Sequence, residues 1–92
     1  MPGYRHVILF RLYAQADPDE VLRRLRSLAD QPGVLHWRVE RSEDERKGTV
    51  VVQDSTFASR AALDAFRVAP DHVEVADFMC RNADWLVADY VE

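Results

Sequence analysis

Several common features are scarce or absent in this 92-residue sequence. Its one cysteine, Cys80, cannot form an internal disulfide and has no second cysteine with which to build a thiolate metal site. The apolar run from Val7 to Phe10 ends at Arg11, which is too early for a secretory signal. No apolar stretch approaches the roughly 20 residues of a membrane-spanning helix. We therefore expect a cytoplasmic protein without a membrane partner.

A surplus of positive charge is also lacking, because 12 Lys and Arg residues stand against 16 Asp and Glu residues. Proteins that bind nucleic-acid phosphates regardless of sequence need clustered Lys and Arg, so we expect no nucleic-acid partner. Glycine and proline are few, and 48% of the residues are hydrophobic, which favours one ordered domain over residues 1–92. A domain of this size buries only about two thirds of its unfolded surface, and self-association is a common remedy.

Hydrophobic periodicity predicts four strands and two helical regions. The strands are expected over 4–13, 34–41, 49–57 and 85–91, and the helices from 17 to about 30 and from 59 to just before 70, with a short helical segment from 71 to about 81. Asp17 and Pro18 are typical of a helix start, as cap and first helical residue. Pro32 and Gly33 are expected to end that helix.

The order β, α, β, β, α, β predicts an α+β fold of the ferredoxin-like type, in which helices cover one face of a four-stranded antiparallel sheet. The other face would then expose apolar side chains, including Val7, Leu9 and Val87. A contiguous apolar patch of that size is unusual on a stable monomer. We therefore expect two copies to pair through their sheets as a homodimer.

Four local patterns occur together and in order along the chain. They are Arg5–Phe10, Thr56–Ser59 leading into Ala62–Phe66, Ala69–His72, and Asp89–Tyr90. With these patterns the chain resembles the stress-responsive A/B barrel (Dabb) family, whose subunits dimerise through their sheets into an α+β barrel. The resemblance implies less about function, because the family includes polyketide cyclases of the olivetolic acid cyclase type, which need no metal or organic cofactor, and also stress-associated proteins without assigned chemistry.

The resemblance also implies where a site would lie. The cyclase histidine of the Pro-x-His motif matches His72, and the last-strand carboxylate that orients it matches Asp89. The first-strand histidine matches His6. The cyclase tyrosine at the end of the second helix falls on Phe66, so its hydroxyl is missing and the cyclase mechanism cannot be transferred whole.

These residue types suit an aldol or Claisen ring closure without a cofactor. Such a closure needs a base that removes a proton next to a carbonyl, and His72 suits that task because the ordinary histidine pKa is about 6.5. Asp89 would fix the tautomer of His72 and hold its ring. Alternatively, His72 caps a helix, and its hydrogen bond to Asp89 only joins the last strand to the helical layer.

The side of the first strand that faces the helices is expected to line a substrate pocket. His6 shares that face with Tyr4 and Ile8, and we expect these three residues and Phe66 to contact the substrate. Tyr4 is a candidate donor to replace the missing phenol. The histidines and the carboxylate lack the tight spacing of metal-binding motifs, so no metal is expected. Each subunit would hold one site, away from the dimer contact.

The leading hypothesis is a cofactor-independent, polyketide cyclase-like enzyme that closes a ring in an enolisable polycarbonyl substrate. Two alternatives stay open. One is a cofactorless monooxygenase of the antibiotic-biosynthesis type, in which the enolate of the substrate reacts with oxygen. The other is a noncatalytic stress-responsive barrel protein, for which the dimer itself is the functional unit.

Overall fold

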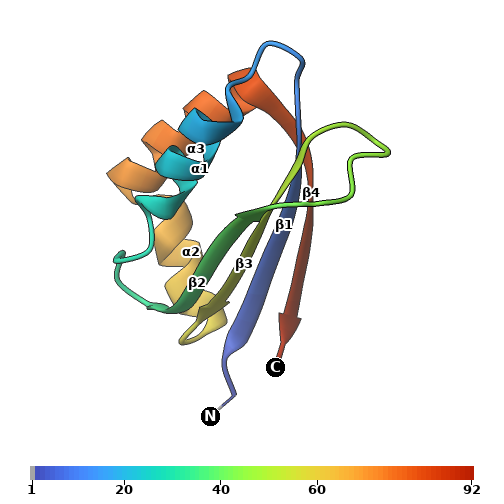
Figure 1. Cartoon of the computed structure of the whole chain (residues 1–92). Helices are drawn as coiled ribbons and strands as arrows, with labels where there is room; N and C mark the ends of the chain where they lie inside the picture. The colour runs from blue at the N-terminus through green and yellow to red at the C-terminus, as the bar shows by residue number, and fades with distance from the viewer. Residues whose placement is uncertain (1) are drawn as a thin grey trace.

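The computed structural model describes residues 2–92 of the chain, which form two layers. The elements in chain order are β1 (Tyr4–Leu12), α1 (Pro18–Arg26), β2 (Val34–Arg41), β3 (Val50–Phe57), α2 (Arg60–Arg67), α3 (Pro70–Asn82) and β4 (Ala83–Val91). Figure 1 shows the three helices on one side of the sheet and both chain ends at the same end of it. The backbone N–H of Glu92 donates to the carbonyl of Gly3 at 3.0 Å, which ties these ends together.

The strand order in the sheet is β2-β3-β1-β4, so that β1 lies between β3 and β4. All three neighbouring pairs of strands are antiparallel. The predicted α+β ferredoxin-like fold with a four-stranded antiparallel sheet is therefore confirmed. None of the helices in the described part of the chain has the length and apolar character that crossing a lipid bilayer requires.

The first helix is shorter than predicted. α1 ends at Arg26 rather than near Asp30, because the backbone then tightens into turns such as the one in which the N–H of Leu28 donates to the carbonyl of Leu25 at 3.2 Å. These turns lead to Gly33, whose φ of 87° is a left-handed conformation that glycine adopts without strain.

The helical segment after Pro70 is longer than predicted. α3 has 13 residues and is the longest helix of the described chain. Pro70 lies in its first turn, where a missing N–H leaves no hydrogen bond unmade, and the preceding Ala69 has the extended backbone that a proline favours in its neighbour. β4 follows directly and begins at Ala83, two residues earlier than expected.

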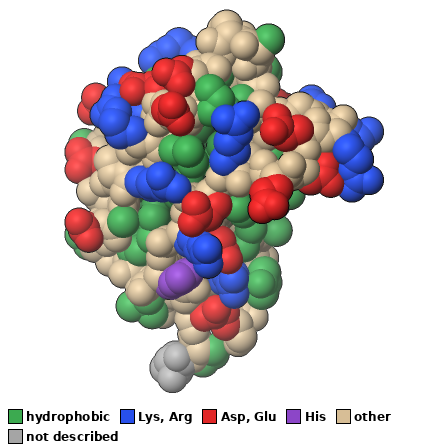
Figure 2. All heavy atoms as spheres, in the orientation of Figure 1, with side chains coloured by type: hydrophobic (Ala, Val, Ile, Leu, Met, Phe, Trp, Pro, Cys, Tyr) green, Lys and Arg blue, Asp and Glu red, His purple; other side chains and the backbone are tan. Residues whose placement is uncertain are grey.

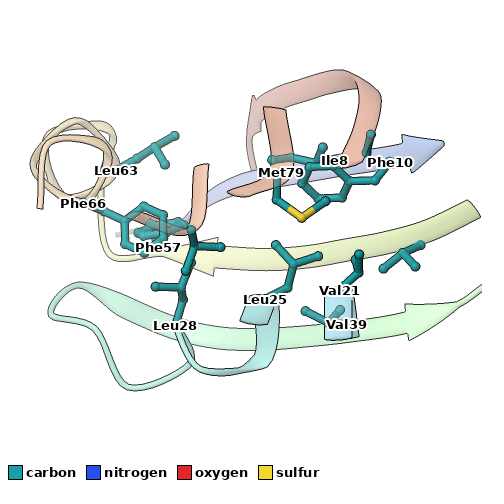
Figure 3. Close-up of a cluster of buried hydrophobic side chains, with 13 residues drawn as sticks. Ile8, Phe10, Val21, Leu25, Leu28, Val39, Phe57, Leu63, Phe66 and Met79 are labelled. Atoms are coloured by element: carbon teal, nitrogen blue, oxygen red, sulfur yellow. The ribbon is translucent and has the colours of Figure 1, made fainter. Parts of the chain in front are cut away.

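A hydrophobic core fills the space between the sheet and the helices (Figure 3). Side chains from β1 and β3 pack against the buried faces of all three helices. The buried apolar residues are Ile8, Phe10, Val21, Leu25, Leu28, Val39, Val51, Phe57, Leu63, Phe66, Val75, Met79 and Ala83. Full burial of one large aliphatic or aromatic side chain contributes about 1.5–3 kcal/mol, so this face of the sheet stabilises the fold.

The opposite, open face of the sheet carries a different set of β4 side chains from the predicted one. Val87 lies opposite Ile8 in the pairing of β1 with β4, so it is on the helix-covered face. The prediction that it joins Val7 and Leu9 on the open face is wrong, because alternation along a strand defines two faces without telling which one meets the helices. Leu86, opposite Leu9, takes that place.

Exposed apolar side chains and paired charges share the open face. Leu9 is 48% exposed and Leu86 is 76% exposed, while Arg5 and Asp54 form an ion pair at 2.7 Å on the same face. Figure 2 shows a similar mixture of acidic, basic and hydrophobic side chains across one side of the molecule. An apolar centre with polar groups around it is typical of protein–protein interfaces.

We predict that the chain dimerises through this open face and that Leu86→Asp weakens the dimer. A carboxylate buried without a partner in the interface should raise the dissociation constant at least about 100-fold. Sedimentation velocity would then show a species near the 10.6 kDa chain mass where the unmodified chain gives about twice that value.

The matched control is Val68→Asp, because Val68 is also 76% exposed but lies at the end of α2, in the helical layer. That variant should remain dimeric. An unmodified chain that sediments as a monomer, or a Val68→Asp variant that dissociates as readily as Leu86→Asp, contradicts the prediction.

Candidate functional site

A cavity of about 220 Å³ lies between the sheet and the helical layer. Most of its wall is apolar, with a few polar side chains from β1, β3, α2 and α3. The lining residues are His6, Ile8, Phe10, Leu25, Leu28, Gln53, Arg67, His72, Val75, Ala76, Met79, Trp85 and Val87. Apolar walls with a small number of placed polar groups are typical of small-molecule sites. The structure thus brings the predicted residues His6, His72 and Ile8 together.

His6 forms the shortest polar contact in the cavity wall, and its partner is Asp89. The two residues lie directly opposite each other in the pairing of β1 with β4. The Nδ1–H of His6 donates to Oδ1 of Asp89 at 2.6 Å, and the other carboxylate oxygen accepts from Arg67 at 2.9 Å. The hydroxyl of Ser55 donates to the backbone carbonyl of His6 at 2.7 Å, so both the ring and the backbone of this residue are held.

The Nε2 atom of His6 remains available to a ligand. The His6 side chain is only 4% exposed, and no hydrogen bond to Nε2 is found among residues 2–92. Within these residues, every side-chain nitrogen or oxygen that is sealed from solvent has a hydrogen-bond partner, so the unbonded Nε2 atom is accessible. Because His6 lines the cavity, the space that Nε2 reaches is the cavity. With Nδ1 carrying the proton, the neutral ring presents a lone pair there.

His72 lies in the same wall but has a different partner from the predicted one. Its Nδ1–H donates to the backbone carbonyl of Arg67 at 2.9 Å, and its ring packs on the ring of Phe66 at 4.6 Å between centroids. The prediction of a hydrogen bond between His72 and Asp89 is wrong, because the strand register places Asp89 beside His6. The first-turn position of His72 in α3 instead brings its ring to the end of α2.

Two other predicted pocket residues lie outside the cavity wall. Phe66 is 3% exposed and packs within the core against Phe57 and Trp37, so it supports His72 rather than contacting the cavity. Tyr4 lines a separate shallow hollow beside Tyr90 near the chain ends. Tyr4 is not among the residues that line the cavity with His6, so it does not take the place of the missing phenol there.

Burial and neighbouring charges shift two pKa values at the site in the same direction. Burial lowers the pKa of His72 below its ordinary value, an effect that the hydrogen bond to the Arg67 carbonyl opposes in part. For Asp89, burial alone would raise the pKa, but the hydrogen bond from His6, together with the hydrogen bond and charge of Arg67, outweighs it and holds the pKa below the usual range. Near neutral pH His72 is therefore uncharged, and Asp89 is ionised.

A comparison with protein-family models shows which family contains this site. The model of the Stress responsive A/B Barrel Domain (Dabb) matches residues 4–92. The chain belongs to this family. No protein among the curated sequences matches it. The predicted membership of the Dabb family is thereby confirmed, while a role as a polyketide cyclase remains a proposal.

Solved structures share the fold over nearly the whole Dabb domain. A Dabb family protein from Mesorhizobium loti is 26% identical, with 100% of this chain and 98% of that chain covered and a TM-score of 0.75. A hydroxynitrile lyase from Passiflora edulis is 22% identical, with 99% and 94% covered and a TM-score of 0.84. A dimeric ferredoxin-like protein of unknown function from Thermobifida fusca is 18% identical, with 99% and 92% covered and a TM-score of 0.85.

Reasoning from the sequence of this Dabb domain missed two polar residues of the cavity. Arg67 ends α2 and holds Asp89 through its guanidinium group, a contact that no local pattern indicates. Gln53 lies on the helix-covered face of β3, where it is 3% exposed. The sequence did contain a sign of Gln53. By alternation it falls on the same face of the strand as the apolar residues Val51 and Phe57, and it is the one amide side chain on that face.

We predict that the lowered pKa of His72 makes the domain less stable as the pH falls from 7.5 to 5.5. The unfolded chain takes up a proton on this residue near pH 6.5, whereas the folded chain does so only at lower pH, so acid favours unfolding in this window. The contribution of Asp89 has the same sign but is lost at lower pH, as the carboxylate is protonated.

Urea unfolding followed by circular dichroism, at pH 7.5 and pH 5.5, measures this loss. The His72→Asn variant should lose less free energy of unfolding between the two values than the unmodified chain does. Comparing the two differences removes any constant effect of the substitution on packing. An equal loss in both proteins would show that His72 does not carry this pH dependence.

Proposed function

We propose that this Dabb domain is a cofactor-independent enzyme that makes or breaks a carbon–carbon bond at an oxygen-bearing carbon, with His6 as the base. The observation that carries the proposal is the ring of His6 in the cavity wall, with Nδ1 held by Asp89 at 2.6 Å and Nε2 open to the cavity. In such a pair the carboxylate fixes the tautomer and stabilises the positive charge that the imidazole gains on taking a proton.

The proposed reaction balances without an oxidant or reductant. In the cleavage direction, Nε2 of His6 takes the proton of a substrate hydroxyl, the electron pair of that oxygen forms a carbonyl, and the adjacent carbon–carbon bond breaks. The pair of electrons from that bond leaves with the departing cyanide or enolate, which then takes the proton back from His6. Addition follows the same steps in reverse.

Two related activities fit this scheme. Cleavage of a cyanohydrin is one form of it, and the structure from Passiflora edulis with the same fold is named a hydroxynitrile lyase. Aldol ring closure of a short polyketide-like polycarbonyl chain is the intramolecular form of the reverse reaction. In both forms, His72 supplies a second neutral imidazole to the cavity, and Asp89 serves His6 as the positioning residue.

The size of the cavity limits the substrate. A dry cavity of about 150 Å³ is enough to hold benzene, so about 220 Å³ accommodates one ring with a short substituent. The wall is mostly apolar, which favours an uncharged aromatic or aliphatic body with one or two oxygen groups.

Two small substrates that release the same product provide the test. Mandelonitrile yields benzaldehyde and hydrogen cyanide, and 4-hydroxy-4-phenylbutan-2-one yields benzaldehyde and acetone, so ultraviolet absorbance of benzaldehyde follows both reactions. We predict turnover above the buffer rate with at least one of them. His6→Asn should lower kcat/KM by about 10²–10⁴-fold, and Asp89→Asn should lower it at least about tenfold.

The remaining histidines act as controls for this prediction. His36→Asn alters an exposed histidine on the open face and should keep the unmodified rate. His72→Asn should reduce the rate less than His6→Asn does, whereas the opposite ranking would return the role of base to His72. If the chain neither turns over nor binds either substrate, the result favours the noncatalytic alternative for the domain.

A further inference from the structure

Gln53 occupies a position in the sheet where packing alone favours an apolar side chain. It lies on the helix-covered face of β3, opposite Ile8 of β1 and Val39 of β2, both of which are buried. Its own exposed fraction is 3%. An amide at such a place costs free energy unless its donors and acceptor find partners.

Residues 2–92 supply no such partner. No hydrogen bond to the side chain of Gln53 is found within residues 2–92, although neighbouring Ser55 bonds to the His6 carbonyl. No side-chain nitrogen or oxygen in that range is both unpaired and sealed from solvent, so the amide atoms of Gln53 reach open space. That space is the cavity that Gln53 lines. Its two N–H donors and one acceptor are thus directed to whatever the cavity holds.

We infer that the amide of Gln53 donates a hydrogen bond to the oxygen of a small carbonyl, enol or phenol ligand in the cavity, and that it holds this oxygen while His6 moves the proton. The inference rests on the proposed function, because that reaction places negative charge on an oxygen and needs a preorganised donor beside it. The class of ligand is a single-ring or similarly small compound with one such oxygen.

The strand register gives the two groups a suitable separation. Ser55 lies opposite His6, and Gln53 lies two residues further along β3, so Gln53 is the diagonal neighbour of His6 on the same face. The Cα atoms of such a diagonal pair are about 7–8 Å apart, which leaves room for a substrate oxygen and its carbon between the two side chains.

Arg67, another donor in the cavity wall, is already engaged. The guanidinium group of Arg67 is bonded to Asp89 and lies 3.6 Å from Asp64. The position of the family's tyrosine holds Phe66, which has no hydroxyl, and Tyr4 lies in a separate hollow. Gln53 is thus a cavity-lining donor of residues 2–92 whose side-chain hydrogen bonds are all unmade. In that range the indole N–H of Trp85 is also unbonded, but Trp85 lies opposite Phe10, four residues along β1 from His6.

Binding of two probes of nearly equal shape tests the inference. The probes are 4-nitrophenol, which carries a hydroxyl, and 4-nitrotoluene, which carries a methyl group in its place. The variant is Gln53→Met, because methionine keeps the length of the side chain and loses the amide. We expect the variant to bind 4-nitrophenol about tenfold or more weakly than the unmodified chain, as loss of a hydrogen bond to a charged or polarised oxygen implies, and to bind 4-nitrotoluene equally well.

Two further variants separate the donor from the fold. Gln53→Glu keeps the shape but replaces the donating NH₂ with an accepting oxygen, and it should also bind 4-nitrophenol weakly. Gln15→Met makes the same exchange as the first variant at an exposed glutamine outside the cavity and should leave both affinities unchanged. Urea unfolding should show Gln53→Met at least as stable as the unmodified chain, because a merely structural glutamine would lose stability on replacement.

The possible outcomes distinguish the donor role of Gln53 from the proposed role of His6. If Gln53→Met binds both probes like the unmodified chain, or loses both equally, or unfolds more readily, the donor role of Gln53 is wrong while the role of His6 stands. If the unmodified chain binds neither probe, the donor role fails together with the small-ring substrate of the proposed function. A selective loss of 4-nitrophenol supports the inference.

Discussion

The pairing of β1 with β4 is the constraint on which the rest of the site depends. One register places His6 opposite Asp89 and Ile8 opposite Val87, so that an imidazole, its carboxylate partner and part of an apolar wall all lie on the same face of the sheet. A shift by one residue would turn every β4 side chain to the other face and would move Asp89 away from the cavity. The bond from Arg67 to Asp89 also anchors this register to the helical layer.

This register also places the cavity and the exposed apolar side chains on opposite faces of the sheet. The helices cover one face of the sheet and enclose the cavity there, while Leu9 and Leu86 remain exposed on the other face. Two subunits that paired through their open faces would each keep a complete site, because His6, Gln53 and His72 all belong to one chain. The protein of the same fold from Thermobifida fusca is described as dimeric.

The sequence allowed the helix-covered face of β1 to be predicted only together with the family resemblance, which places His6, Ile8 and Phe10 beneath the helices, where all three are buried. It did not allow the partner of Asp89 to be predicted, because that partner depends on how two distant strands align. The same reason explains the misplaced Val87. The family resemblance pointed to His6, His72 and Asp89 but paired Asp89 with His72, whereas the structure pairs it with His6, since a motif specifies residue types rather than contacts.

Phe66, which the resemblance to the cyclases places at the position of a tyrosine, has a structural consequence for any chemistry in this cavity. Phe66 packs on the His72 ring and strengthens the core, but it contributes no donor to the space beneath the helices. A reaction that builds negative charge on oxygen must then find its donor elsewhere, and the sheet provides one at Gln53. Base and donor would both stand on hydrogen-bonded central strands, and groups on such strands keep their geometry better than groups on loops. The proposed donor role would account for the buried amide, which packing alone disfavours.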